Sequence, residues 1–180
     1  TRFVPSESMK LIFGIFCPCG LVFSYLEACH QFASAYQCRM QVVQLSNEND
    51  TLNLGSKLME ILTKGDVLAI TGDLGAGKTT LARGMIQSEL GNIEVPSPTY
   101  TLVQIYDMKN FELWHCDMYR LEYPEDAHEL GLFDAFEDAV CVIEWPEKLG
   151  SLLPKNIYNI YLKFDDNGRL AYLEGFEKNL

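Results

Sequence analysis

A glycine-rich loop holds the residues best suited to chemistry, with the letters GDLGAGKT at positions 72–79. This order fits the phosphate-binding pattern G-x-x-x-x-G-K-[ST]. Glycines let the backbone curl so that its N–H groups point inward at phosphates. Lys78 can then reach the β- and γ-phosphates, and the Thr79 hydroxyl can coordinate Mg²⁺. We therefore predict ATP and Mg²⁺ as cofactors, held by Gly72, Asp73, Leu74, Gly75, Ala76, Gly77, Lys78 and Thr79.

The segments on either side of the loop are suited to position it. Residues 66–71 form a short apolar run that predicts a buried parallel strand. Residues 81–90 have helical spacing and end at Gly91, so we expect a helix that begins near Lys78. Its N-terminus would add partial positive charge beside the phosphates. A glycine-rich turn without a ligand is the alternative, but the strand before and the helix after favour the phosphate site.

Two acidic residues stand where strands are expected to end. Glu144 follows the apolar run 139–143, and Asp117 follows the β-rich segment 111–116. In open α/β sheets, ligands bind at the carboxyl ends of the strands, and ATP hydrolysis needs a carboxylate in the Mg²⁺ shell. Each acid alone could be a solvated strand end. Together with the loop, they favour a metal site of Thr79 and Glu144, with Asp117 as the other candidate acid.

Three further features lie near these acids in the sequence. Trp145 follows Glu144 directly, and can either pack against the core or stack on a base or ribose. Pro96 and Pro98 stiffen the loop that contains residues 97–99. This loop follows the predicted helix, where P-loop proteins keep a segment that senses the γ-phosphate. His115 alternates with Asp117, so the two side chains share one face of a strand. A histidine that is simply packed in the core fits that alternation equally well.

The other expected elements define the fold class. The sequence predicts parallel α/β structure around the phosphate loop, with antiparallel hairpins added to it. We therefore expect a three-layer α/β P-loop NTPase fold, whose mixed sheet has parallel core strands and antiparallel hairpins. The remaining predictions are a helix over 50–63, a hairpin of 100–107 with 111–117, a helix over 124–130 that ends at Gly131, and a hairpin of 156–164 with 169–176.

The first 39 residues differ in character from the rest of the chain. An uncharged run over 11–26 follows Met9-Lys10, an outline typical of a secretory signal. The run is short for a membrane-spanning helix, and ATP and reducing conditions are cytosolic, so we expect a cytoplasmic protein without a membrane anchor. Residues 1–39 are then an extension of the P-loop ATPase domain 40–180, or sequence upstream of a true start at Met40. The cysteines of the extension match no common zinc spacing: Cys17, Cys19, Cys29 and Cys38, with His30 nearby.

The net charge of the chain argues against a protein that binds nucleic acid directly. The chain has 14 basic and 25 acidic residues, a net charge of −11, and no run of three basic residues. Binding to a phosphate backbone needs clustered lysine and arginine. The net charge can also reflect solubility alone. Any action on nucleic acid would therefore depend on a partner that supplies the positive surface.

Four motifs in order carry a resemblance to a known family. They are GDLGAGKTT at 72–80, SPTYTLV at 97–103, HCDMYRL at 115–121 and VIEWP at 142–146. Together they closely resemble the TsaE family, small bacterial ATPases that serve in making the threonylcarbamoyl-adenosine (t6A) modification of tRNA. The resemblance covers about residues 41–154 and leaves residues 1–39 without a counterpart.

The resemblance implies a Mg²⁺-dependent ATPase that supports the TsaB and TsaD proteins, and that meets tRNA only indirectly. It implies that Lys78 and Thr79 bind phosphate and Mg²⁺, and that Thr80 supports the phosphate site. It also implies roles for four residues in or near the site. Glu144 would be the Walker-B-like Mg²⁺ partner, Asp117 a second acid needed for turnover, Trp145 part of the nucleotide site and Thr99 part of a loop beside the phosphates. Lys78, Asp117 and Glu144 are thus the candidate catalytic residues.

Two other functions fit a P-loop protein of this size. A small-molecule kinase would need an acceptor site and a lid rich in arginine, but only Arg120 and Arg169 follow the predicted P-loop helix. A nucleotide-sensing module without useful turnover would look similar in sequence. Phosphate release from ATP without an added acceptor separates these functions from an ATPase.

Overall fold

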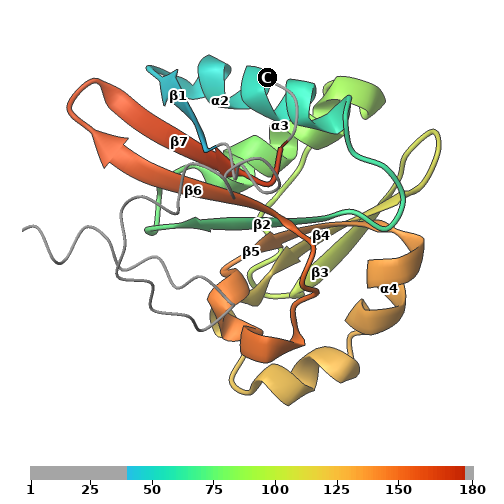
Figure 1. Ribbon diagram of the computed structural model, residues 1–180. Helices are drawn as coiled ribbons and strands as arrows, with labels where there is room; N and C mark the ends of the chain where they lie inside the picture. The colour runs from blue at the N-terminus through green and yellow to red at the C-terminus, as the bar shows by residue number, and fades with distance from the viewer. Residues whose placement is uncertain (1–39, 177–180) are drawn as a thin grey trace, which may run out of the picture. The chain divides into compact units, whose positions relative to one another are not determined.

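A computed structural model of the chain describes residues 40–176, which form a mixed sheet with a helical layer on each face (Figure 1). The sheet of the described residues has seven strands in the order β1-β7-β6-β2-β5-β4-β3. Strands β6, β2, β5 and β4 run parallel, and β1, β7 and β3 pair antiparallel at the two sides. The strands are β1 (Gln41–Leu45), β2 (Val67–Gly72), β3 (Val103–Asp107), β4 (Glu112–Asp117), β5 (Val140–Glu144), β6 (Tyr158–Asp165) and β7 (Gly168–Glu174).

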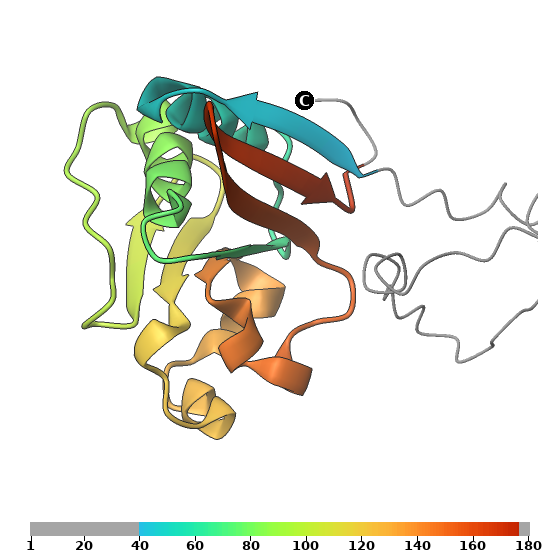
Figure 2. The same ribbon diagram turned by 90° about the vertical axis from the view of Figure 1, so that its left-hand side faces the viewer.

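Both faces of the central strands are buried, which explains their nearly continuous apolar sequences. In β2, Leu68 and Ile70 join a core under α2 (Glu48–Met59) and α3 (Lys78–Leu90). Val67 points to a second core that includes Leu132 of α4 (Leu132–Asp138). Figures 1 and 2 show α2 and α3 on one face of the sheet and α4 on the other. The predicted three-layer α/β P-loop fold is confirmed.

Close packing of α2 against α3 holds the helix that follows the phosphate loop. Two glycines lie where the helices meet. A Cβ at Gly55 would collide with the backbone carbonyl of Leu81, and one at Gly84 would collide with that of Leu52. Glycine lets the two backbones approach at these points, so α3 has a fixed position against α2 and the sheet.

The secondary structure of the segment before β5 differs from the prediction. A helix begins at Pro124 as predicted, but it is a 3₁₀ helix that ends at His128 and does not continue to residue 130. Gly131 was expected to end that helix, but it precedes α4, which the sequence did not predict. Its φ of 72° lies in the left-handed region that glycine reaches without strain, so it turns the chain into α4.

Other boundaries differ less from expectation. Both hairpins form, with the first strand starting at Val103 rather than residue 100. The helix expected over 50–63 runs from Glu48 to Met59. Strand β1 was not predicted, because it is stabilised by pairing with β7, more than 120 residues later in the chain.

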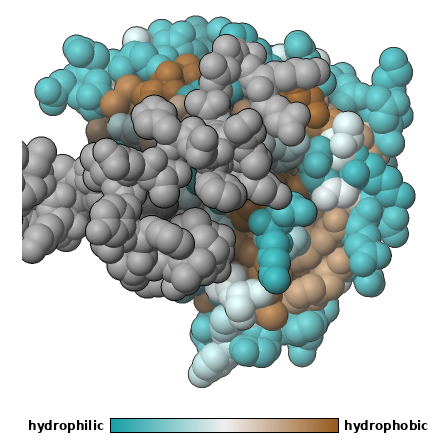
Figure 3. Space-filling view, in the orientation of Figure 1, coloured by the Kyte–Doolittle hydropathy of each residue, from teal (hydrophilic) through white to brown (hydrophobic). Residues whose placement is uncertain are grey.

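The visible surface of the described residues carries both hydrophilic and apolar side chains. Where the view of Figure 3 leaves described residues visible, hydrophilic side chains dominate the rim and apolar patches lie between them. Within residues 40–176, no helix combines the length and apolar character needed to cross a membrane. The extension 1–39, with its four cysteines and His30, lies outside the described residues, so the domain boundary at Met40 stays a prediction.

Candidate functional site

The predicted phosphate loop joins the end of β2 to the start of α3. Gly75 and Gly77 have φ values of 79° and 104°, which side chains with a Cβ rarely adopt. Gly77 is the N-cap of α3, and no side chain of the described residues caps that helix end with a hydrogen bond. The N–H groups of the first turn are therefore available to an anion. The loop thus has the backbone form that the sequence predicts.

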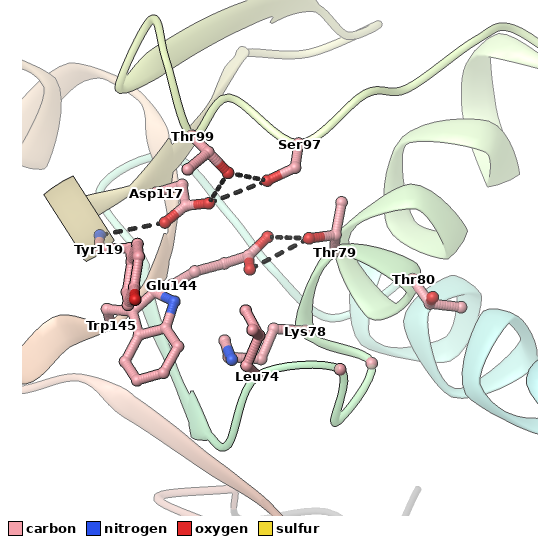
Figure 4. Close-up of a pocket in the computed structure, with 12 residues that line it drawn as sticks. Leu74, Lys78, Thr79, Thr80, Ser97, Thr99, Asp117, Tyr119, Glu144 and Trp145 are labelled. Carbon is pink, nitrogen blue, oxygen red and sulfur yellow. Dashed lines mark hydrogen bonds between the residues drawn. The ribbon is translucent and has the colours of Figure 1, made fainter.

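A cleft of about 270 Å³ opens between this loop, the segment 97–99 and the ends of β4 and β5 (Figure 4). It brings together most of the residues predicted from the sequence. Of the predicted loop residues, Gly72, Asp73 and Ala76 do not line it, and Figure 4 shows Thr80 apart from the acids. The lining residues are Leu74, Gly75, Gly77, Lys78, Thr79, Thr80, Ser97, Thr99, Asp117, Tyr119, Glu144 and Trp145.

The ammonium group of Lys78 is held inside the loop. Its Nζ donates hydrogen bonds to the carbonyl oxygens of Gly72, at 2.7 Å, and Asp73, at 2.9 Å. It also lies 4.0 Å from the centre of the Trp145 ring, a cation–π contact. Burial lowers the pKa of Lys78 below its usual range, and the charge of Glu144 opposes that shift. The loop therefore buries a cation beside an acid.

Thr79 meets Glu144 across the cleft. The Thr79 hydroxyl lies 2.8 Å from Oε1 and 3.1 Å from Oε2 of that carboxylate, and donates to it. The contact forms because β5 runs parallel to β2, with Glu144 opposite Ile70. A hydroxyl and a carboxylate are ligands that Mg²⁺ accepts. No cluster of three or more histidine, cysteine, aspartate or glutamate side chains that could hold a metal occurs among the described residues.

Asp117 ties the segment 97–99 to the end of β4. Its Oδ2 accepts hydrogen bonds from the hydroxyls of Ser97, at 2.9 Å, and Thr99, at 2.7 Å. Its Oδ1 accepts from the backbone N–H of Tyr119 at 3.1 Å. Asp117 is buried and lies opposite Glu144 in the pairing of β4 with β5. One acid thus contacts the phosphate-loop helix, and its neighbour contacts the loop above the cleft.

Trp145 adopts a backbone conformation that is costly for its type. Its φ of 58° lies in the left-handed region, which costs roughly 1–2 kcal/mol for a residue with a Cβ. The ring packs against Lys78 and also against Tyr119, whose ring centre is 5.0 Å away. Of the two roles open from the sequence, core packing describes this ring incompletely, because it also lines the cleft.

The structure adds residues to the site that the sequence did not assign. His115 is fully buried, and its Nε2 lies 2.8 Å from Oε1 of Glu144. Its alternation with Asp117 was the available signal. Arg169 of β7 donates from Nη2 to the carbonyl oxygen of Gly75 at 3.2 Å. No local pattern could reveal that contact, because it depends on where the β6–β7 hairpin lies.

Comparison with known proteins places these features in one family. Residues 45–171 match the family model described as threonylcarbamoyl adenosine biosynthesis protein TsaE. A relative from Rickettsia bellii, named tRNA threonylcarbamoyladenosine biosynthesis protein TsaE, is 38% identical over 71% of this chain and 90% of its own. A relative of the same name from Haemophilus influenzae is 40% identical, over 69% of this chain and 83% of its own.

Structural comparison agrees with the sequence matches. The crystal structure of YdiB from Bacillus subtilis superposes with a TM-score of 0.66 and 27% identity, over 78% of this chain and 88% of that one. The family match spans the phosphate loop, both acids and Trp145. The chain therefore belongs to the TsaE family of threonylcarbamoyladenosine biosynthesis proteins.

Proposed function

We propose that this chain binds Mg-ATP in the cleft and hydrolyses it, to support a TsaB–TsaD complex in the t6A modification of tRNA. The observation that carries the proposal is the contact between the Thr79 hydroxyl and the Glu144 carboxylate. It joins the first turn of the phosphate-loop helix to the end of a neighbouring strand. Phosphoryl-transfer P-loop proteins need those two ligands at that point.

In this proposal, different residues bind the phosphates, neutralise their charge, hold Mg²⁺ and orient the attacking water. The backbone N–H groups of the loop and the N-terminus of α3 bind phosphate oxygens. Lys78 neutralises charge on the β- and γ-phosphates, and Trp145 shields its ammonium group from water. Thr79 and Glu144 would hold Mg²⁺, which offsets charge on the transferring phosphoryl group. Asp117, the second acid, would help orient the attacking water.

The hydrogen bonds of Asp117 give the site a route to a partner. They attach Ser97, which is exposed, and Thr99, which is partly buried, to the end of β4. In P-loop switches, contacts to the γ-phosphate order such a loop, and hydrolysis releases it. We infer that the loop reports the nucleotide state to TsaB–TsaD. The acidic chain, with no run of three basic residues, fits a helper that meets tRNA only through that complex.

Phosphate release from ATP tests the catalytic part of the proposal. The protein alone should release phosphate slowly with Mg²⁺ and no acceptor, and faster with TsaB–TsaD. Lys78→Ala serves as the inactive control. Release only after a small-molecule acceptor is added would indicate a kinase. Nucleotide binding without release under any condition would indicate a sensing module.

Titration against TsaB–TsaD tests the switch. Calorimetry with ATP, ADP or no nucleotide should give different affinities for the partner pair. Thr99→Ala removes one hydrogen bond to Asp117, so it should weaken this dependence while ATP affinity stays within a few-fold. Equal partner affinity in all three nucleotide states would refute the switch, because a ligand without differential affinity shifts no equilibrium.

A further inference from the structure

We propose that His115 is a positioning residue that orients the Glu144 carboxylate for the metal, an inference that rests on the proposed Mg-ATP site. Two features of this histidine point beyond packing. Its side chain is fully buried, and its Nε2 contacts Oε1 of Glu144 at 2.8 Å. The contact joins two central parallel strands, because His115 lies on β4 and Glu144 at the end of β5.

The direction of this hydrogen bond follows from the chemistry of its partner. An ionised carboxylate only accepts hydrogen bonds, so the proton must be on Nε2 and must be donated to Glu144. The other ring nitrogen, Nδ1, is buried and has no hydrogen-bond partner among residues 40–176. The side-chain hydrogen bond of His115 is therefore the one that Nε2 makes with Oε1 of Glu144.

Oε1 of Glu144 accepts hydrogen bonds from two side chains, and the two differ in their position relative to the proposed metal. Oε1 accepts from His115 and from the Thr79 hydroxyl, whereas the hydrogen bond to Oε2 from within the described part of the chain comes from Thr79, at 3.1 Å. In the proposed site, the Thr79 oxygen also serves the metal. His115 does not line the cleft, so its hydrogen bond remains available to fix the rotation of the carboxylate. Histidines and carboxylates near metals are commonly oriented by such outer partners.

A purely structural histidine would behave differently from a positioning one. Its loss would lower the free energy of unfolding and would weaken nucleotide binding equally with and without Mg²⁺. Loss of a positioning residue would instead reduce the gain in affinity that Mg²⁺ produces. The ratio of the dissociation constants in EDTA and in Mg²⁺ measures that gain, and it separates the two roles without any measurement of turnover.

The test uses two variants of matched length, His115→Gln and His115→Met. The amide nitrogen of glutamine can occupy the place of Nε2 and donate to Glu144. Methionine fills similar space without a donor and leaves no buried polar group of its own. Both variants and the wild-type protein are titrated with a non-hydrolysable ATP analogue in EDTA and in Mg²⁺, and thermal melting checks that each one is folded.

We expect His115→Met to lose about 10- to 100-fold of the Mg²⁺-dependent gain, the range typical for loss of an outer metal-site partner. Affinity in EDTA should stay near the wild-type value. His115→Gln should restore most of the gain. His115→Asn, whose amide takes the place of Nδ1, should behave like His115→Met, and it provides a second comparison if methionine does not fold.

Two results would overturn the inference. One is a wild-type gain in His115→Met, whether affinity is unchanged or falls equally in EDTA and Mg²⁺, and the other is failure of His115→Gln to differ from His115→Met. These outcomes are distinct from failure of the proposed function. If the wild-type protein itself binds the analogue without any gain from Mg²⁺, or does not bind it, the Mg-ATP site is wrong and not only the role of His115.

Discussion

The substitution Glu144→Gln separates the proposed metal-binding role of Glu144 from its structural role. Glu144 is buried, and its carboxylate accepts hydrogen bonds from Thr79 and His115. Glutamine has the same shape and keeps one carbonyl oxygen that can accept from both donors. It removes the negative charge on which a Mg²⁺ ligand depends. We therefore expect Glu144→Gln to lower the rate of ATP hydrolysis much more than it lowers the stability of the fold.

The contacts of Glu144 allow an estimate of how much Glu144→Gln lowers the free energy of unfolding and how much it lowers kcat. Hydrogen bonds to a charged group contribute about 1.5–3 kcal/mol and neutral ones about 1 kcal/mol, so weakening two of them costs roughly 1–4 kcal/mol. Neutralising Glu144 also removes repulsion from Asp117 on the neighbouring strand, so we expect a net loss of about 2 kcal/mol. Removing one preorganised electrostatic group lowers kcat by about 10²- to 10³-fold, or about 2.7–4 kcal/mol of barrier.

The assay pairs phosphate release at saturating Mg-ATP with thermal melting of the same preparation. Glu147→Gln is the matched control, since Glu147 is an exposed acid near Lys78 whose loss changes the net charge equally. The control should melt and turn over like the wild-type protein. Near-normal turnover by folded Glu144→Gln would refute the metal-ligand assignment. An equal loss of turnover in Glu147→Gln would assign the effect to charge in general.

Three further substitutions test the loop and the helix that holds it. Burial lowers the folded-state pKa of Lys78 below 10.5, so the unfolded chain binds more protons just below pH 10.5. The free energy of unfolding, measured in urea, should therefore rise with pH in that window for the wild-type protein relative to Lys78→Met. Arg169→Met removes the hydrogen bond to Gly75 and should weaken nucleotide binding about fivefold, or about 1 kcal/mol, by calorimetry in EDTA and Mg²⁺ alike. Gly84→Ala drives a Cβ into the backbone of α2 and should lower the free energy of unfolding by about 1–3 kcal/mol in urea melts.

The parts of the site that the sequence predicted are those set by local chemistry. The phosphate loop could be recognised because its glycines, Lys78 and Thr79 are adjacent and stand between an apolar run and a helical pattern. Glu144 and Asp117 could be expected to meet because parallel strands end at one edge of a sheet. The register confirms this, with Asp117 opposite Glu144. The ligands themselves, ATP and Mg²⁺, stay a proposal.

The parts that the sequence missed depend on long-range pairing or on one glycine. Arg169 reaches the phosphate loop because β6 pairs with β2, which places the β6–β7 hairpin beside Gly75. Strand β1 has only five residues and forms against β7. The sequence around Gly131 predicts a helix end, yet a glycine with positive φ can equally lead into a helix. Residue spacing alone does not distinguish these cases.

The charges buried around the cleft connect the fold to the proposed chemistry. Asp117 and Glu144 are 3% and 2% exposed, on neighbouring strands, and Lys78, at 4%, is the buried cation beside them. Within residues 40–176, no arginine forms an ion pair with either acid. The acids have other partners: two hydroxyls and a backbone N–H contact Asp117, and a hydroxyl and the imidazole of His115 contact Glu144. Hydrogen bonds of this kind do not cancel a negative charge as an arginine would, so in the proposed site the charge of Asp117 and Glu144 is available to a divalent cation.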